Sequence, residues 1–394
     1  MSVADLSKEL LSTFSSFDDH EHVRRFELEE GIVAFIAVHN TNLGPALGGC
    51  RMRAYKDESE AINDVLRLSR GMTYKNAMAG LPLGGGKAVI IGDPKIDKTP
   101  ALMEAMGKAV DSFEGAYITA EDSGTAEEDM VSIAKETDFV TGLPPEMLEG
   151  SKYGELGGNP SPLTALGCYH GIKAAIDFRY NGEKELKDMT VSIQGVGAVG
   201  LELAKLLHQD GAKLIICDVS EENLKAAQQE IPTAEVVDPM DIYGVEADIF
   251  APCAMGGVLN DNTIELLKVG IIAGAANNQL LEDHHNQMLQ SRNILYVPDY
   301  VINSGGVICV GYEFFRNSGY NPQDFNIQRG SMVKHVESIG KTVTEILERA
   351  EEITKPTGET ADKIAEERFL KGSALNDNEE ADDSAESPSS NLVQ

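Results

Sequence analysis

Two lysines, Lys75 and Lys87, lie in the segment 71–87 (GMTYKNAMAGLPLGGGK), and the second follows directly after three glycines. Glycine allows backbone and ligand to approach closely and adopts backbone angles that other residues avoid. Burial and a second cation nearby would both lower the pKa of a lysine held there, which suits a general base or a nucleophile. An isolated pair at this spacing would more often be two surface lysines beside a flexible loop, so the neighbouring motifs must decide.

An acidic cluster follows at residues 119–122 (TAED), and Asp122 is the candidate for proton transfer. On an extended backbone Glu121 points away from its neighbour, so only one of the two carboxylates is expected to face a cleft. The alternative interpretation is an exposed acidic turn ahead of a helix, because three more acidic residues follow at 127–129.

A G-x-G-x-x-G element stands between an apolar, β-branched run and a helical pattern; its six residues are Gly195, Val196, Gly197, Ala198, Val199 and Gly200. In a dinucleotide-binding turn the first glycine allows the tight turn, the second lets backbone N–H groups meet a pyrophosphate, and the third permits close helix packing. Asp218 ends the next predicted strand. Its carboxylate would accept hydrogen bonds from ribose hydroxyls and repel a 2′-phosphate, which favours NAD over NADP.

These motifs belong to seven segments that occur in the same order in one known family: 44–52, 67–90, 119–125, 159–167, 194–200, 274–280 and 298–307. Together they resemble the amino-acid dehydrogenase superfamily of glutamate, leucine, phenylalanine and valine dehydrogenases, and the leucine branch most of all. The resemblance covers residues from about 40 to 310. It implies an N-terminal α/β substrate and oligomerisation domain, a doubly wound Rossmann NAD-binding domain, a cleft between them, and a homo-oligomer with an even number of subunits.

The resemblance also assigns roles to the charged residues. Lys87 would be the catalytic lysine that acts when water attacks the iminium carbon, Lys75 would hold the substrate carboxylate as a permanent cation, and Asp122 would carry protons to and from the amino group. Two neighbouring lysines penalise each other's charge, so the less compensated one should lose its proton first.

Two asparagines follow an apolar strand in the segment GAANNQL. The resemblance places one asparagine there; we expect Asn278 to meet the substrate and Asn277 the nicotinamide amide, without excluding the reverse, and a turn formed by asparagine side chains is the alternative. Thr164 is a lesser candidate for the nicotinamide amide.

The expected substrate pocket is apolar, with candidate residues Leu47, Gly48, Gly49, Ala120 and Val301 or Val307. The glutamate branch has a lysine where this chain has Leu47, and burying a substrate carboxylate without a partner costs several kcal/mol. The phenylalanine branch tends to have glycine at the position of Ala120. We therefore expect reversible oxidative deamination of leucine, valine and isoleucine, with a phenylalanine or broad-range enzyme, or a catalytically silent NAD-binding sensor, as alternatives.

The chain of 394 residues is long enough for two domains, and its net charge of −31 disfavours nucleic acid and membrane partners. Five scattered cysteines argue against disulfides and zinc, and His284-His285 resembles a metal pair only superficially, because adjacent residues do not share a helix face. We expect no metal. The N-terminus lacks the pattern of a secretory signal, so a cytoplasmic protein is expected.

The pattern predicts strands at 32–38 and 87–91 and helices at 58–71 and 101–113 in a first domain, and alternating strands and helices from 164 to 275 in a second. The expected divisions are 1–145, 146–331, helices at 332–372 that return to the first domain, and a tail at 373–394. The tail has six acidic residues and no basic ones, which predicts disorder.

Overall fold

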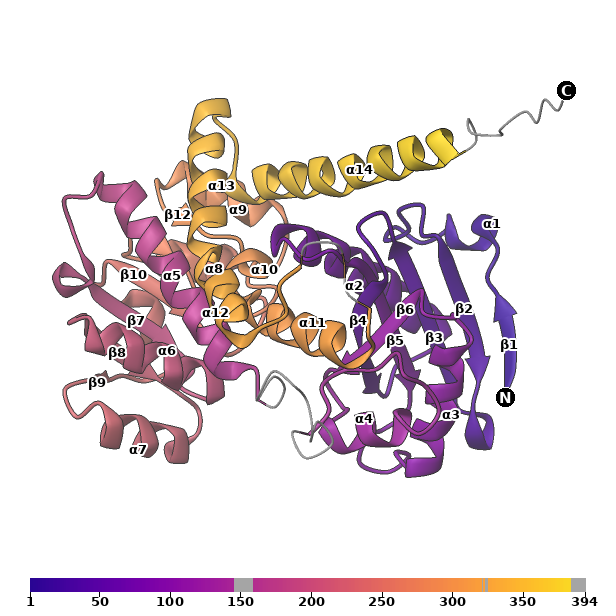
Figure 1. Cartoon of the computed structure of the whole chain (residues 1–394). Helices are drawn as coiled ribbons and strands as arrows, with labels where there is room; N and C mark the ends of the chain where they lie inside the picture. The colour runs from indigo at the N-terminus through magenta and orange to yellow at the C-terminus, as the bar shows by residue number, and fades with distance from the viewer. Residues whose placement is uncertain (145–158, 321, 323–324, 384–394) are drawn as a thin grey trace, which may run out of the picture.

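The computed structural model describes residues 1–144, 159–320, 322 and 325–383, with side chains up to residue 371. Two α/β domains lie side by side, and helices from the C-terminal part of the chain lie between and above them (Figure 1). The predicted fold class is confirmed. The expected boundary at 145/146 falls outside the described residues.

The first domain is built on a six-stranded mixed sheet in the order β1-β2-β3-β5-β4-β6. The strands are β1 (Ser2–Asp5), β2 (His22–Glu27), β3 (Val33–Asn40), β4 (Ala46–Arg53), β5 (Gly84–Ile91) and β6 (Tyr117–Glu121). The pairs β1–β2, β2–β3 and β3–β5 are antiparallel, whereas β4 is parallel to both of its neighbours, β5 and β6. The sequence places Lys87 within β5 and Asp122 directly after β6, two strands that flank β4.

The helices of this domain are α1 (Lys8–Leu11), α2 (Glu58–Met78), α3 (Pro100–Asp111) and α4 (Glu127–Ile133). Asp57 caps α2 by accepting from the Glu60 N–H, and Thr99 caps α3 in the same way. Helix α2 runs past the predicted end at Gly71, and Lys75 lies in its last turn. An internal glycine costs about 1 kcal/mol, which the burial of Tyr74 and Met78 outweighs.

The second domain has a six-stranded parallel sheet in the order β12-β11-β10-β7-β8-β9. Its strands are β7 (Thr190–Gln194), β8 (Lys213–Cys217), β9 (Glu235–Val236), β10 (Ile249–Pro252), β11 (Ile271–Ile272) and β12 (Leu295–Tyr296). Its helices are α5 (Ser161–Tyr180), α6 (Ala198–Gln209), α7 (Glu221–Glu230), α8 (Asp261–Leu266) and α9 (His284–Ser291). The strand order reverses at β7, which is where open α/β sheets bind ligands.

The remaining helices are α10 (Asp299–Ile302), α11 (Gly305–Asn317), α12 (Arg329–Glu337), α13 (Ile339–Ile353) and α14 (Thr357–Asp383). The helices at 332–372, which were expected to return to the first domain, pack against both domains. Helices α12 and α13 pack mainly on α5 of the second domain, and α14 crosses to α2 (Figure 1). There the Arg368 guanidinium donates to the carbonyl oxygens of Ala77 and Met78, both at 3.1 Å, and so satisfies the end of α2.

Helix α14 continues to Asp383, into the segment from residue 373 for which disorder is expected, and the disorder of the tail stays a prediction. A helix already begun adds one hydrogen bond for each residue that it fixes. Residues 384–394 lie outside the described part.

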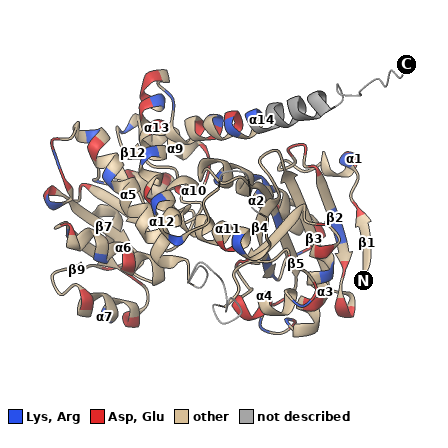
Figure 2. Ribbon diagram, viewed as in Figure 1, with Lys and Arg blue, Asp and Glu red and all other residues tan. Residues whose placement is uncertain are grey.

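Acidic residues occur on α3, α4, α7 and α13, elements of both halves of the molecule (Figure 2). All five cysteines are free, as expected. In the described part of the chain, no helix combines the length and the apolar character that a membrane crossing requires.

Candidate functional site at the domain junction

Lys87 is buried in β5, with 6% of its surface exposed, and its Nζ lies 2.5 Å from Oδ2 of Asp122. The three glycines before it are part of the strand rather than the expected loop. A Cβ on Gly85 would stand 2.0 Å from the Thr73 backbone nitrogen, and one on Gly86 would stand 2.6 Å from the Tyr117 ring. The glycines therefore let α2 and β6 pack tightly around the strand that carries the lysine.

Asp122 has a second cationic partner that sequence reasoning missed. The Arg51 guanidinium lies 3.2 Å from the same Oδ2 atom and 3.1 Å from Oδ2 of Asp64. Burial alone would raise the pKa of Asp122, but the positive charges of Lys87 and Arg51 outweigh it and lower that pKa to about 2. Glu121 is exposed, so one carboxylate of the pair faces inward, as expected.

Lys75 joins the two domains. Its Nζ donates a 2.7 Å hydrogen bond to Oδ1 of Asn303, and the Asn303 amide donates a 2.7 Å hydrogen bond to Oδ1 of Asn277. Burial, with a contribution from the charge of Lys87, lowers the pKa of Lys75 to about 8, although the carboxylate of Asp299 opposes the shift. Lys75, whose hydrogen-bond acceptor is a neutral amide, is therefore the less compensated of the two lysines, and its role as the cation for the substrate carboxylate stays a prediction.

Asp299 and Asn303 were not assigned by sequence reasoning, although both lie in the segment 298–307 that carried the family resemblance. The Asp299 carboxylate accepts a 2.6 Å hydrogen bond from the Gln279 backbone N–H, and burial raises its pKa. The sequence signal for these two residues was the segment DYVIN, a short apolar run with a polar residue at each end.

The two neighbouring asparagines differ in place. The side chain of Asn277 is connected to Lys75 through Asn303, as described above. Asn278 has a φ of +51°, a left-handed conformation that is typical of turns, and its carbonyl oxygen accepts a 2.7 Å hydrogen bond from the Gly257 N–H of a distant segment. The structure thus gives Asn277 the more direct connection to Lys75, and the contacts of both asparagines with substrate or cofactor stay predictions.

Thr164 lies in the first turn of α5, where its hydroxyl donates to the Pro160 carbonyl oxygen at 3.1 Å. A Cβ on Gly306 would stand 2.8 Å from that hydroxyl oxygen, so the starts of α5 and α11 are close together. Its contact with a nicotinamide stays a prediction.

The predicted pocket residues are buried on β4, on β6 and near the start of α11. Leu47 and Val301 each have 1% of their surface exposed and belong to the same apolar cluster as Val307. A Cβ on Gly48 would stand 1.7 Å from the Gly86 carbonyl oxygen, and one on Gly49 would stand 2.9 Å from the Asp122 Cβ. Gly49 therefore makes room for Asp122. Contact of these residues with a substrate stays a prediction.

The glycine-rich turn lies between β7 and α6. Gly195 has a φ of +91°, and a Cβ on Gly200 would stand 2.0 Å from the Gly195 carbonyl oxygen. At Gly197, the residue before α6, a Cβ would meet only the Asn223 side chain, at 3.9 Å. The three glycines thus provide a tight turn, an open helix N-terminus and close packing, which is the arrangement a pyrophosphate requires.

Asp218 follows β8 and faces this turn. It accepts hydrogen bonds from the N–H groups of Val196 and Ser220, at 2.9 and 2.8 Å, and from the Asn223 amide at 3.2 Å. These contacts fix its carboxylate beside the turn, where the ribose of a dinucleotide would lie. Val219, directly after it, has 91% of its surface exposed and offers an apolar contact next to that position.

His284 and His285 are adjacent in the chain, yet both imidazoles approach the carboxylate of Asp261 on the neighbouring helix α8, because the two residues begin α9 beside the start of α8. These three residues are the only group of potential metal ligands among the described residues.

Comparison with known proteins agrees with this architecture. Residues 20–139 match the family described as Glu/Leu/Phe/Val dehydrogenase, dimerisation domain, and residues 216–372 match Glutamate/Leucine/Phenylalanine/Valine dehydrogenase. Leucine dehydrogenase of Geobacillus stearothermophilus is 48% identical over 92% of this chain and 93% of its own length, and that of Thermoactinomyces intermedius is 50% identical over 90% and 91%.

Among solved structures, L-tryptophan dehydrogenase from Nostoc punctiforme has a TM-score of 0.76 and 41% identity, over 90% of this chain and 96% of its own. The matches include the strand that carries Lys87, the turn that leads to Asp122 and the segment that contains Asn303. The chain belongs to the glutamate/leucine/phenylalanine/valine dehydrogenase family of amino-acid dehydrogenases.

Proposed function

We propose that the protein catalyses the NAD-dependent, reversible oxidative deamination of L-leucine, L-valine and L-isoleucine to 2-oxo acids and ammonia. The observation that carries this proposal is the buried Lys87–Asp122 pair at 2.5 Å, next to a second lysine that is joined to the other domain. The two leucine dehydrogenases that share about half of its residues support the substrate class.

The substrate carboxylate is assigned to Lys75. This lysine has a neutral amide, rather than a carboxylate, as its hydrogen-bond acceptor, and the cost of its burial lowers its pKa. An anionic substrate group would supply the counter-charge and favour the protonated lysine. Asn303, which belongs to the second domain, orients the ammonium group of Lys75. Substrate binding at Lys75 is therefore coupled to the relative position of the two domains.

The proton steps are assigned to Asp122 and Lys87. Asp122, which the charges of Lys87 and Arg51 keep ionised, carries protons to and from the substrate amino group. Lys87 first releases its own proton to solvent and then takes one from the water that attacks the iminium carbon. When Lys87 carries the proton, it stabilises the carbinolamine oxygen. Arg51 keeps the carboxylate ionised and in place throughout.

The second domain fits a dinucleotide. NAD, when bound, accepts the hydride from the amino-acid Cα. The open N-terminus of α6 at Gly197 suits the pyrophosphate, and the carboxylate held by Val196 and Ser220 suits ribose hydroxyls and repels a 2′-phosphate. Asp218 therefore supports NAD over NADP.

Apolar walls support an aliphatic side chain over glutamate. Leu47 offers no charge to a side-chain carboxylate, which would be buried without a partner. The second candidate is an aromatic or broad-range amino-acid dehydrogenase, favoured by the likeness to the L-tryptophan dehydrogenase structure. The methyl group of Ala120 opposes it, because a methyl decides roughly 1–3 kcal/mol in such a pocket.

The first domain matches a dimerisation domain, which supports self-association. We extend this to a homo-oligomer with an even number of subunits, in the cytoplasm, with small molecules as its other partners.

The test is NADH or NADPH formation by the purified protein with leucine, valine, isoleucine, phenylalanine, tryptophan and glutamate. Leucine, valine and isoleucine with NAD should exceed glutamate by orders of magnitude in kcat/KM. A preference for an aromatic substrate would favour the second candidate, a preference for NADP would contradict the role of Asp218, and NAD binding without any turnover would favour a sensor.

A further inference from the structure

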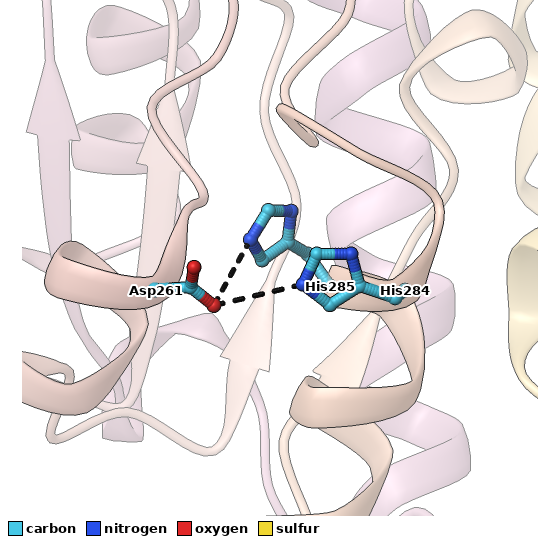
Figure 3. A group of neighbouring side chains, drawn as sticks. All are labelled: Asp261, His284 and His285. Carbon is cyan, nitrogen blue, oxygen red and sulfur yellow. Dashed lines mark ion pairs between the residues drawn. The ribbon is translucent and has the colours of Figure 1, made fainter.

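We infer that Asp261, His284 and His285 form a binding site for a divalent transition-metal ion of the zinc class, on the second domain and outside the residues assigned to catalysis. Asp261 is the first residue of α8, and the two histidines are the first residues of α9. Figure 3 shows both imidazoles turned toward the Asp261 carboxylate, with a nitrogen of each ring facing the same oxygen atom.

The distances suit one shared ion. Oδ1 of Asp261 lies 3.6 Å from Nε2 of His284 and 3.4 Å from Nε2 of His285, and the three ligand atoms all lie within 4.8 Å of one another. Zinc bonds of about 2.0–2.1 Å in tetrahedral geometry separate neighbouring ligand atoms by about 3.3 Å. Small side-chain rotations would therefore bring all three atoms into bonding range without moving the helices.

His285 is the observation that separates this group from an ordinary surface cluster. Its side chain has 1% of its surface exposed, and its buried Nε2 makes no hydrogen bond to any described residue. A buried polar atom without a hydrogen bond is costly, and 3.4 Å to the Asp261 carboxylate is too long to compensate for it. A metal ion would give this nitrogen a partner.

The surroundings of His285 can support the metal-binding tautomer. When Nε2 binds a metal, the ring hydrogen lies on Nδ1, and the Glu282 carbonyl oxygen stands 3.0 Å from that atom. In the other tautomer Nδ1 accepts from the Glu282 N–H, also at 3.0 Å, and Nε2–H points at Asp261 over the long distance. The site thus holds the ring orientation in either tautomer, and an ion selects the first.

The other two ligands leave the site open to solvent, because 49% of the His284 side chain and 72% of the Asp261 side chain are exposed. Three protein ligands with an open fourth position allow a water or hydroxide ligand. Two imidazoles favour zinc, copper, nickel or cobalt over calcium or magnesium, which prefer oxygen ligands. The Glu282 carboxylate, 3.3 Å from Nδ1 of His284, adds negative charge at the rim.

An ion at this position would join two segments that already pair. The Leu259 N–H donates to the Gln279 carbonyl oxygen at 2.9 Å, and the Leu281 N–H donates to the Leu259 carbonyl oxygen at 3.0 Å. Asp261 follows one of these segments and the histidines follow the other. Metal binding should therefore stabilise the turn that carries Asn277 and Asn278, and raise the melting temperature of the protein.

The experiment is a titration of the full-length, chelator-treated protein with Co²⁺, followed by visible absorption, and with Zn²⁺, followed by calorimetry and thermal unfolding. We expect one ion per chain, the intense visible bands of tetrahedral Co²⁺, and a higher melting temperature with Zn²⁺. The variant His284→Ala, which changes an exposed side chain, should weaken binding at least about tenfold and abolish the melting-temperature shift, since even outer-shell changes cost about 10–100-fold.

Asp261→Asn should weaken binding in the same way, whereas His22→Ala, which removes an exposed histidine on β2, should leave it unchanged. The inference is overturned if no ion binds at millimolar concentration, if His284→Ala and Asp261→Asn bind as tightly as the unmodified protein, or if His22→Ala weakens binding to the same extent. NADH formation is not the readout, so failure of the metal site would leave the proposed activity intact.

Discussion

Lys87 and Lys75 come from the same domain, yet their surroundings differ in one respect that decides their chemistry. Lys87 lies 2.5 Å from a carboxylate that Arg51 also contacts, so its charge is compensated before any ligand arrives. Lys75 donates instead to the neutral amide of Asn303, and burial lowers its pKa to about 8. In the proposed function, the first lysine takes part in proton transfer with Asp122, and the second binds the substrate carboxylate.

The rule that the less compensated of two neighbouring lysines loses its proton first applies here to Lys75, because burial lowers its pKa to about 8. If Lys75 binds the substrate carboxylate as proposed, substrate binding is the step most sensitive to pH around 8.

The largest effect is expected from Lys87→Ala. Turnover should fall about 10²–10⁴-fold while NAD still binds, because an acid–base group is lost and the dinucleotide turn lies in the other domain. Steady-state kinetics and NAD titration measure the two quantities. Lys98→Ala is a matched control, since Lys98 forms a partly buried 2.7 Å ion pair with Asp129 in the same domain. Near-normal activity of Lys87→Ala would contradict the catalytic assignment of Lys87.

Lys75→Ala should act mainly on substrate affinity. The loss of a charge-assisted contact with the substrate carboxylate costs about 1.5–3 kcal/mol, which corresponds to a rise in KM of roughly 10–100-fold. Asn303→Ala should raise KM less than Lys75→Ala does, because it removes the amide that orients the Lys75 ammonium group but leaves the charge of Lys75 in place. A fall in kcat with unchanged KM for Lys75→Ala would move this lysine from the anchor to the chemical step.

A smaller effect is expected from pH on the unmodified protein. Lys75 is protonated below its pKa of about 8 and loses its charge as the pH rises. The KM for leucine should therefore rise above pH 8, by about tenfold for each further pH unit, as the protonated fraction falls. Lys75→Arg, which keeps the charge at every pH, should flatten the profile; a KM that is constant from pH 7 to 9.5 would contradict the shifted pKa.

Sequence patterns predicted most of the fold, because apolar periodicity and the glycine-rich turn report local structure. They also singled out Lys75, Lys87, Asp122 and Asp218 as candidates, whose roles stay predictions. They missed Arg51, Asn303 and Asp299, whose partners are distant in the chain: Arg51 reaches Asp122 across 71 positions, and Lys75 reaches Asn303 across 228. Such pairs follow from strand order and domain packing, which a single sequence does not display.

The smallest expected effect concerns stability. The folded-state pKa of Lys75 lies below the value of 10.5 for an unfolded chain, so the unfolded state binds more protons between pH 8 and 10.5, and the stability of the unmodified protein rises with pH in that interval. Below pH 8 the buried charge costs the folded state on the order of 1–3 kcal/mol, allowing for its partial exposure.

Lys75→Met keeps the length of the side chain and removes the charge. It should therefore raise the free energy of unfolding by about that amount at pH 7, less whatever is lost when the Asn303 oxygen loses its donor. Chemical denaturation of both proteins at pH 7 and pH 10.5 measures the difference in the free energy of unfolding, which should shrink at the higher pH because Lys75 is then neutral in the folded state.

Lys87→Met is the contrasting variant. It leaves Asp122 with one cation fewer and should destabilise the protein at pH 7. Equal effects of the two methionine variants would show that the neighbouring lysines share one electrostatic environment, and the distinction between a compensated and an uncompensated lysine would then fail.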